Sequence, residues 1–254
     1  MSTILITGGG RGIGYELAKQ LVRLPASEVA LVLVTARGPS KLLDGLVAAS
    51  AGRVLRFHCE ATDEQSVQAF AAELDTKLGG KGVDILVNNI GVMPITEGGM
   101  HALDAAELLS TFDINVVSAH RMTVAMIPLL QKGSGKKIAN VSTPLGSIEY
   151  ASRYTWLSTP AYKVTKAAMN MMTAQYALDL GKQGFTVVAV SPGWLQTDMG
   201  SKDADLDVDT GVSALRNLIL STKEDANGKF FNIHVPGWEN AKGPNQYDGA
   251  EIPW

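Results

Sequence analysis

A glycine-rich turn stands between an apolar segment and an amphipathic one at the start of the chain. Residues 1–7 are mostly apolar or β-branched, which favours a buried strand, and residues 15–22 carry apolar side chains at helical spacing. Glycines at positions 8, 9, 10, 12 and 14 lie between the two. A strand that turns directly into a helix is a basic unit of sheets covered by helices. This feature predicts an α/β fold.

The same alternation continues along the chain. Apolar strand candidates at 29–37, 54–59 and 83–87 are separated by amphipathic stretches, without internal repeats, linkers or low-complexity tracts. The pattern predicts a doubly wound parallel sheet with helices on both faces. With 254 residues, of which 46% are hydrophobic, the chain can bury one large core without metals or disulfides. We therefore expect a single domain over residues 1–254.

The glycine turn also predicts a ligand. Glycine lets the backbone approach a pyrophosphate closely, and the free N–H groups at the start of the following helix favour an anion. The glycines at 8, 12 and 14 are spaced differently from the usual Gly-x-Gly-x-x-Gly dinucleotide pattern. The alternative is a flexible turn without a ligand, but its place between a buried strand and a helix favours nucleotide binding.

Tyr162 and Lys166 form the second informative pattern. Residues four apart on a helix project from the same face, so a phenol and an ammonium group can share one pocket. A free tyrosine keeps its proton up to about pH 10, and a nearby cation lowers that pKa toward the range of a general acid or base. The alternative is chance spacing on a solvated helix face, which the spacing alone does not exclude.

Short glycine and polar motifs follow one another along almost the whole chain. They are Thr7 with Gly8, Gly12, Ile13 and Gly14; Asn88 to Gly91; Asn115; Val141 to Thr143; Tyr162 with Lys166; and Ser191 to Gly193 leading to Thr197. In this order and at these intervals they resemble the classical short-chain dehydrogenase/reductase family. Within it, the segments at 161–170, 192–199 and 247–254 are most similar to the carbonyl reductase group that includes the Sniffer and C-factor proteins. The resemblance implies a single-domain Rossmann fold.

The resemblance also implies a catalytic group. Tyr162 gives the proton, Lys166 lowers the pKa of that tyrosine and binds the nicotinamide ribose, and Asn115 holds a water that links the lysine to solvent. A hydroxyl should polarise the substrate oxygen, and this chain reads Ser142 and Thr143 where the family generally has two serines. The register before the following glycine favours Thr143, and Ser142 stays the alternative.

The end of the second strand candidate predicts the choice of cofactor. Residues 29–37 lack the carboxylate that accepts hydrogen bonds from both ribose hydroxyls of NAD, and they supply Arg37 instead. A guanidinium suits a 2′-phosphate because its planar fork combines charge with directed donors. Arg11, in the glycine turn, is a second candidate for the same phosphate. The alternative for either arginine is a plain surface charge, but the two together favour NADP(H).

Further cofactor contacts follow from the resemblance. Glu60 and Ala61 stand where the family commonly has an aspartate that touches the adenine, and Ile90 stands where it usually has alanine. The remaining candidates lie after the fourth strand candidate and in a turn at the C-terminal edge of the sheet. They are Asn89 and Gly91 in the first segment, and Pro192, Gly193, Leu195 and Thr197 in the second.

Aromatic and methionine side chains near these motifs bear on the substrate. Some lie in a long segment before the helix of Tyr162, where they either line a pocket or pack a loop, and others are candidates for an apolar wall. Such a wall suits a hydrophobic or aromatic ketone. The first group is Tyr150, Tyr154 and Trp156, and the second is Met93, Trp194 and Met199.

Composition argues against several other classes of protein. A net charge of −3 and a pI near 5.8 disfavour a general nucleic-acid surface. We see no signal peptide and no apolar stretch long enough to span a bilayer, and therefore expect a cytoplasmic protein without membrane contact. Cys59 ends a buried strand candidate, and the four histidines lack ligand spacing, so we expect no metal site.

The family resemblance further implies a homodimer or homotetramer, built largely from the helices that carry Asn115 and Tyr162. Apolar side chains on the second helix serve either that interface or the internal core, and their spacing does not distinguish the two. They are Met169, Met171, Met172 and Tyr176.

Together these features predict an NADPH-dependent carbonyl reductase. It would transfer hydride between the nicotinamide and a carbonyl or secondary alcohol of a hydrophobic or aromatic small molecule. The alternative from another class is an NADP-binding signalling or redox-sensor protein with little turnover. A pure sensor has no need for Tyr162, Lys166, Asn115 and a hydroxyl together, so the full set favours an enzyme.

Overall fold

A seven-stranded parallel sheet lies at the centre of the protein, in a computed structural model that describes residues 1–254. The strand order is β3-β2-β1-β4-β5-β6-β7, so the order reverses between β1 and β4. Ligands of such sheets bind outside the carboxyl ends of the strands at this reversal. The strands are β1 (Ser2–Ile6), β2 (Val29–Ala36), β3 (Val54–His58), β4 (Ile85–Asn88), β5 (Lys137–Val141), β6 (Thr186–Ser191) and β7 (Phe230–Asn232).

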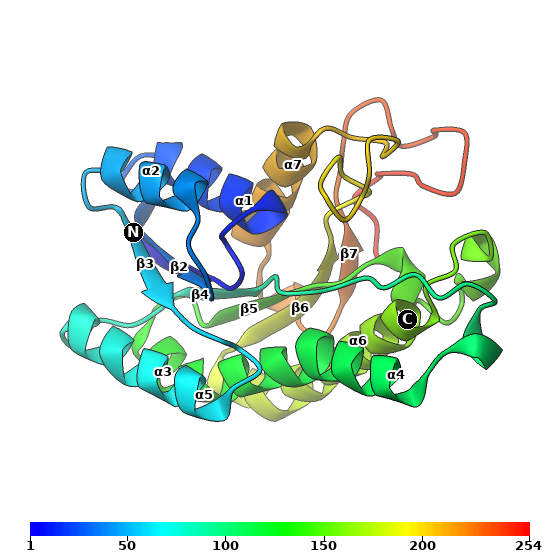
Figure 1. Ribbon diagram of the computed structural model, residues 1–254. Coiled ribbons are helices and arrows are strands. Elements are labelled where there is room, and N and C mark those ends of the chain that lie inside the picture. Colours follow the sequence, from blue (N-terminus) through cyan, green and yellow to red (C-terminus); the bar gives the residue numbers. More distant parts are fainter.

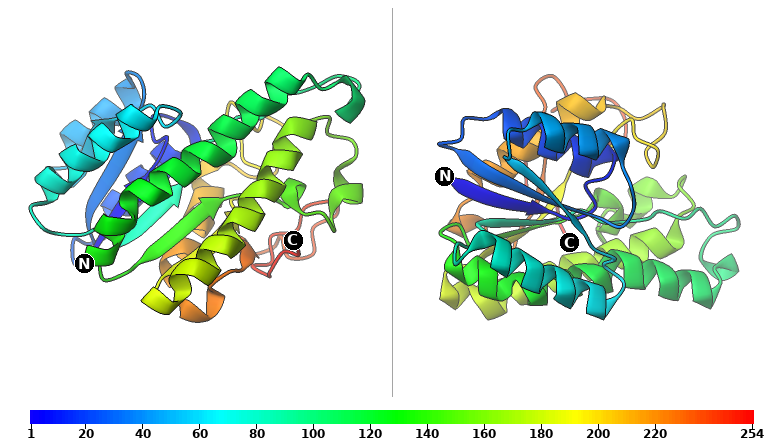
Figure 2. Two further views of the ribbon diagram at one scale, coloured as in Figure 1. Left: turned by 90° about the horizontal axis from the view of Figure 1, so that it is seen from below. Right: turned by 60° about the vertical axis from the view of Figure 1, so that its left-hand side comes forward.

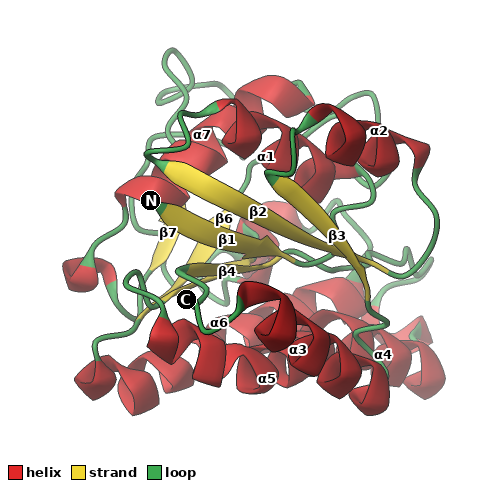
Figure 3. Cartoon of the chain, turned by 90° about the vertical axis from the view of Figure 1, so that its left-hand side faces the viewer, coloured by secondary structure: helices red, strands yellow, loops and turns green.

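Two layers of helices cover the sheet (Figures 1 and 3). Helices α1, α2 and α7 lie on one face, and α3, α5 and α6 lie on the other. This arrangement confirms the predicted doubly wound α/β fold in a single domain. The helices are α1 (Gly12–Arg23), α2 (Lys41–Ala49), α3 (Glu64–Leu78), α4 (Ala105–Phe112), α5 (Ser118–Lys132), α6 (Pro160–Leu180) and α7 (Val208–Ser221).

Alternating side chains of the central strands divide the core between the two faces. In β1, Ile4 and Ile6 pack on the side of α1 and α7, whereas Leu5 packs with Phe70 and Phe185 on the other side. A strand has a side-chain period of two, so a strand covered on both faces needs apolar residues at successive positions. The continuous apolar runs in the sequence are therefore strands buried on both faces.

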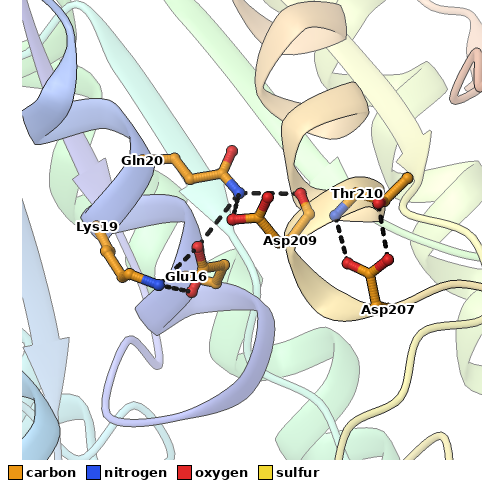
Figure 4. Close-up of polar contacts among 6 residues, drawn as sticks. All are labelled: Glu16, Lys19, Gln20, Asp207, Asp209 and Thr210. Atoms are coloured by element: carbon orange, nitrogen blue, oxygen red, sulfur yellow. Dashed lines mark hydrogen bonds and ion pairs between the residues drawn. The ribbon is translucent and has the colours of Figure 1, made fainter.

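Polar side chains join α1, which begins at the glycine turn, to α7 (Figure 4). The Gln20 amide nitrogen donates to the main-chain oxygen of Asp209 at 3.0 Å and to Glu16 Oε1 at 3.3 Å. Lys19 Nζ lies 2.9 Å from the second oxygen of Glu16, and Asp207 caps the start of α7. These contacts fix the helix after the glycine turn against the helix that follows the loop at 194–207.

Helices α5 and α6 lie side by side under the sheet (Figure 2, left). On α6, Met169 is 1% exposed and belongs to the interior, whereas Met171 is 62% exposed. Tyr176 is half-buried, and its hydroxyl lies 2.7 Å from His120 Nδ1 on α5. None of the helices combines the length and apolar character needed to cross a bilayer. The cytoplasmic location stays a prediction.

Candidate active site

The glycine turn lies between the ends of β1 and β4 and adopts a backbone that requires glycine. Gly8 and Gly12 have φ of +68° and +55°, in the left-handed region. A Cβ on Gly8 would lie 2.8 Å from Ile90 Cγ1, and one on Gly14 would lie 2.7 Å from the Gly8 carbonyl oxygen. The turn is therefore packed closely against the segment after β4, as its predicted role requires.

The start of α1 fits an anionic group. Arg11, the residue before the helix, is extended, and no side chain caps the first N–H groups of the helix. Uncapped N–H groups at a helix start, next to glycines without side chains, are the usual surroundings of a bound phosphate. A Cβ on Gly12 would lie 3.9 Å from Thr197 Cγ2, so the loop after β6 faces the glycine turn. The glycine turn and the loop after β6 thus lie next to each other at the start of α1.

Asn89 ties the ends of β1 and β4 together. Its side-chain nitrogen donates to the carbonyl oxygen of Thr7 at 2.9 Å, and its backbone N–H donates to Thr7 Oγ1 at the same distance. The bulky Ile90, where the family usually has alanine, covers Gly8 rather than leaving the turn open. Gly91 follows Ile90 and is half-buried.

Arg37 and Glu60 face each other at the ends of β2 and β3. The Arg37 guanidinium is 77% exposed and lies 3.9 Å from Glu60 Oε2. The other oxygen of Glu60 accepts the Thr62 hydroxyl at 2.9 Å, and Ala61 is buried. The two predicted contacts of the adenosine end therefore lie together.

Arg11, the second predicted cation, forms an ion pair with the loop after β6. Its guanidinium pairs with Asp198 at 3.0 Å, and both side chains are about four-fifths exposed, at 78% and 80%. Asp198 belongs to the loop after β6, whereas Arg37 pairs with a carboxylate after β3. In the protein without cofactor, each of the two arginines is therefore paired with a carboxylate of its own, and the part of Arg11 at the 2′-phosphate stays a prediction. The sequence could not indicate the pairing of Arg11, because the partner lies 187 residues away.

The turn after β6 holds the remaining predicted cofactor contacts. Gly193 has φ of +82°, and a Cβ there would lie 3.0 Å from Ile233 and 3.2 Å from Tyr247. Leu195 is 3% exposed and belongs to the main core, so only its backbone can meet a ligand. Pro192 is buried as well, while the hydroxyl of Thr197 accepts the N–H of Gly200 at 3.1 Å.

Tyr162 and Lys166 lie on the buried face of α6, 8% and 4% exposed. Lys166 Nζ lies 5.6 Å from the centre of the Tyr162 ring and donates to the carbonyl oxygen of Val141 at 2.7 Å. The phenol oxygen of Tyr162 has no hydrogen-bond partner within the protein. The pair shares one helix face, as the spacing predicts, but the ammonium group does not bind the phenol.

Burial decides the ionisation of both groups. It raises the pKa of Tyr162 well above its ordinary value, and it lowers the pKa of Lys166 to about 8. In the protein without cofactor, burial thus decides the pKa of Tyr162, and the lowering by Lys166 that the resemblance implies stays a prediction. The spacing indicated a shared face, but the direction of the shift depends on how deeply both groups are buried. At neutral pH the phenol keeps its proton.

Asn115 lies in a π-helical turn, Asp113–Val117, between α4 and α5. Its Oδ1 accepts the backbone N–H of Val92 at 2.8 Å. Its side-chain nitrogen donates to the carbonyl oxygen of Val92 and to Thr165 Oγ1, both at 2.9 Å. Such turns are frequent at functional sites. The side chain thus ties the segment after β4 to α6, and its predicted part in holding a water stays a prediction.

Gly91 shows that these segments converge. A Cβ on Gly91 would lie 3.5 Å from Asn115 Oδ1 and 3.7 Å from Lys166 Nζ. A glycine here leaves the space between the amide and the ammonium group free. The segment after β4, the π-helical turn and α6 therefore meet at Gly91.

Ser142 and Thr143 differ in what their hydroxyl groups do. Ser142 is 2% exposed, and its hydroxyl donates to Asn170 Oδ1 at 2.6 Å. Thr143 is partly exposed, and its oxygen accepts the Leu145 N–H at 3.4 Å, while its hydroxyl hydrogen has no acceptor in the protein. Asn170 was not among the predicted residues, although it follows Lys166 by four positions and therefore shares its helix face.

The aromatic residues fall into two groups. Tyr150 packs against Phe230 and Ile252, and the Tyr154 hydroxyl donates to the C-terminal loop at Asn245, so both pack loops. Trp156 is 56% exposed, and its ring centre lies 6.0 Å from that of Trp194, whose Nε1 donates to the Gly200 oxygen at 2.6 Å. This tryptophan pair brings together the loops before α6 and after β6 and is a candidate for an apolar wall. Met93 is half-buried, and Met199 is 43% exposed.

A polar cluster behind this wall was not predicted. The Tyr247 hydroxyl donates to Asp205 Oδ2 at 2.5 Å and accepts the Trp194 N–H at 3.1 Å. Asn245 donates to the same carboxylate oxygen at 2.7 Å. The partners are separated by 40 to 53 residues and have no common spacing, so no local signal indicates them. The structure also groups no three potential metal ligands, and the absence of a metal site stays a prediction.

The sequence matches the family model of short chain dehydrogenases over residues 2–206. The C-signal protein of Myxococcus xanthus is 34% identical over 172 residues, which cover 68% of this chain and 93% of that protein. Short-chain dehydrogenase srdF of Neurospora crassa is 31% identical over 265 aligned positions, covering 100% of this chain and 98% of that protein.

Solved structures show the same likeness. The carbonyl reductase Sniffer of D. melanogaster superimposes with a TM-score of 0.86 and 30% identity, and the match covers both chains completely. The NADPH-bound carbonyl reductase from chicken fatty liver gives a TM-score of 0.86 with 25% identity, covering 100% of this chain and 99% of that one. These matches confirm the predicted resemblance. The chain belongs to the short-chain dehydrogenase/reductase family.

Proposed function

We propose that the protein is an NADPH-dependent carbonyl reductase. One observation carries the proposal: the phenol of Tyr162 and the hydroxyl hydrogen of Thr143 have no protein partner, whereas the polar groups around them are paired. Ser142, Lys166 and Asn115 each hydrogen-bond to protein atoms. Two unengaged donors, one on α6 and one on the turn that packs against it, suit an oxygen atom that gains negative charge.

The residues of the chain account for the fate of the substrate oxygen. Bound NADPH supplies the hydride to the carbonyl carbon. As charge grows on the oxygen, Tyr162 transfers its phenolic proton to that atom, and Thr143 donates a hydrogen bond to it. The raised pKa of Tyr162 keeps this proton in place at neutral pH, which suits the direction of reduction. Lys166 binds the nicotinamide ribose and supplies positive charge.

The cofactor is held from both sides of the crevice. The glycine turn and the start of α1 bind the pyrophosphate, and Asn89 and Gly91 border the adenosine ribose and the floor. Arg37 binds the 2′-phosphate and thereby selects NADP(H), because no carboxylate ends β2 and the guanidinium is free to move from Glu60 toward a stronger anion. The turn at Pro192 and Gly193 supports the nicotinamide.

The tryptophan pair indicates the class of substrate. Trp156 and Trp194 bring aromatic rings of the loops before α6 and after β6 within 6.0 Å of each other, and Met199 adds an exposed apolar side chain on the same loop as Trp194. Aromatic and methionine side chains of this kind bind planar apolar groups. We therefore infer a hydrophobic or aromatic ketone, diketone or quinone as substrate.

A panel of quinones, diketones and aromatic ketones, assayed for NADPH oxidation and product, tests the proposal. We expect turnover of at least one aromatic member, with a higher kcat/KM for NADPH than for NADH. Binding of NADPH without any oxidation above background across the panel would refute the reductase and support the alternative of a signalling or redox-sensor protein. Faster turnover with NADH would refute the cofactor assignment alone.

We also propose that the protein forms a homodimer or homotetramer through α6. Val164, Met171 and Leu178 are spaced seven residues apart and are 40%, 62% and 72% exposed, so they form an apolar stripe on one side of the helix. Light scattering on the protein and on Met171→Glu tests this. We expect the substitution to shift the mass toward a monomer, and a wild-type monomer at working concentrations would refute the proposal.

A further inference from the structure

The turn that carries Thr143 is held against α6 at two successive levels. It begins at the end of β5 and continues into a short 3-10 helix, Pro144–Gly146. At the first level, Lys166 Nζ binds the Val141 carbonyl oxygen at 2.7 Å. A Cβ on Gly146 would lie 2.6 Å from the Lys166 carbonyl carbon, so the far end of the turn presses on the same residue. The second level is Asn170.

Asn170 contacts both sides of Thr143 with one amide group. Its Oδ1 accepts the Ser142 hydroxyl at 2.6 Å, and its Nδ2 donates to the Gly146 carbonyl oxygen at 3.2 Å. Both bonds are buried, and the Asn170 side chain is 3% exposed. An amide is suited to this position because it combines an acceptor and a donor, which a carboxylate or a hydroxyl does not do in the same geometry.

The turn itself is closed by local bonds. The Gly146 N–H donates to the Thr143 carbonyl oxygen at 2.9 Å, and the Thr143 side-chain oxygen accepts the Leu145 N–H. With Ser142 and Gly146 both fixed by Asn170, the residue between them has little freedom to move relative to α6. Helix α6 also carries Tyr162. The positions of the Thr143 hydroxyl and the Tyr162 phenol are therefore both fixed by the same helix.

We propose that Asn170 is a positioning residue for the reaction, which fixes the Thr143 hydroxyl relative to Tyr162. The inference rests on the proposed reductase function and on Thr143 as the hydroxyl donor. It also gives Ser142 a part: its hydroxyl serves as the anchor of the turn and does not reach the substrate. The order Tyr162, Lys166, Asn170 then places a proton donor, a cation and an anchor at four-residue intervals on one helix face.

A double-mutant cycle between Asn170 and Thr143 tests this, with 1-phenyl-1,2-propanedione and NADPH as substrates. We expect Asn170→Ala to lower kcat about tenfold, because small displacements of a reacting group are costly, while the KM for NADPH stays within about twofold. In the Thr143→Ala background, the same substitution should change kcat by less than about twofold, since no hydroxyl remains to be positioned. A merely structural role predicts the same loss in both backgrounds.

Two further variants keep the test decisive if Asn170→Ala folds poorly. Ser142→Ala removes one arm of the anchor and leaves Asn170 in place, so it should give a smaller loss that also disappears in the Thr143→Ala background. Thr173→Val is the matched control. It removes a buried hydrogen bond from Asn140 at 2.9 Å on the same helix, outside the turn, and should lower Tm without changing kcat.

The outcomes separate the inference from the proposed function. An active wild-type enzyme in which Asn170→Ala and Thr143→Ala multiply their losses would overturn the positioning role alone, as would an Asn170→Ala enzyme with unchanged kcat. A wild-type protein that binds NADPH but reduces neither this diketone nor any other carbonyl compound of the panel would overturn the proposed function, and the inference with it.

Discussion

The two ends of the crevice are built in different ways. At the nucleotide end, Arg11 and Arg37 are 78% and 77% exposed, and each faces a carboxylate on another loop. At the reaction end, Tyr162, Lys166 and Asn115 are at most 8% exposed. Exposed ion pairs contribute only about 0–1 kcal/mol, whereas a buried polar group that loses its partner is costly. Substitutions at the nucleotide end can therefore change the cofactor preference at little cost in stability, whereas substitutions of the buried groups at the reaction end are costly.

The sharpest test within the reaction end compares the two adjacent hydroxyl groups. We expect Thr143→Ala to lower kcat about 100-fold, the usual effect of removing one donor to a developing oxyanion. Ser142→Ala should lower kcat by no more than about threefold, because its hydroxyl is bound to Asn170. Steady-state kinetics of both variants, with unfolding curves as the control for folding, check this. Losses of equal size would contradict the different parts assigned to the two residues.

The nucleotide end should respond in a smaller and more selective way. Arg37→Ala should raise the KM for NADPH about tenfold, because a charge-assisted contact to the 2′-phosphate is lost, and should leave the KM for NADH nearly unchanged. Arg11→Ala is the matched control, since its guanidinium pairs with Asp198 instead. If Arg11→Ala changes the NADPH preference more than Arg37→Ala, the assignment of the phosphate site is wrong.

The smallest expected effect is a change of stability with pH, and it arises from Lys166 at the reaction end. Burial lowers the pKa of Lys166 to about 8, while an unfolded lysine keeps its proton up to about pH 10.4. Between these values the unfolded chain holds more protons than the folded one, so the free energy of unfolding of the cofactor-free protein rises with pH. We expect Tm to increase from pH 8 toward pH 10.

Two methionine variants separate the contributions to that rise. Burial also lowers the pKa of Lys137, on β5, to about 8, and its Nζ binds the Ile219 carbonyl oxygen at the end of α7. Lys166→Met and Lys137→Met should each flatten the dependence of Tm on pH, and only the first should weaken NADPH binding. A slope that neither substitution changes would contradict the assignment to these lysines.

The nucleotide end was largely predictable from the sequence because its signals are local. The strand, the glycine turn and the helix follow one another within 23 residues, and the ends of the predicted strands agree with β1 to β4 within two residues. The positive φ of Gly8 and Gly12 explains why glycines stand there. What the sequence could not show is the direction in which Arg11 extends, because its partner lies on a distant loop.

The reaction end was predictable only in part. The spacing of Tyr162 and Lys166 indicated a shared helix face, but the pKa of the phenol depends on burial, which spacing does not determine. The choice between Ser142 and Thr143 depends on which hydroxyl meets Asn170, a contact across 28 residues. The cluster of Asp205 and Tyr247 depends on how the C-terminal loop closes. Such contacts are set by tertiary packing, and no periodicity encodes them.

Tyr162→Phe in a single turnover tests the central claim most directly. The phenol oxygen has no protein partner, so the substitution removes the proton donor and leaves the packing of α6 unchanged. The variant, saturated with NADPH and mixed with 1-phenyl-1,2-propanedione, should oxidise the cofactor about 1,000-fold more slowly than the wild type, with NADPH affinity within about threefold. A rate within about twofold of the wild type would contradict the account.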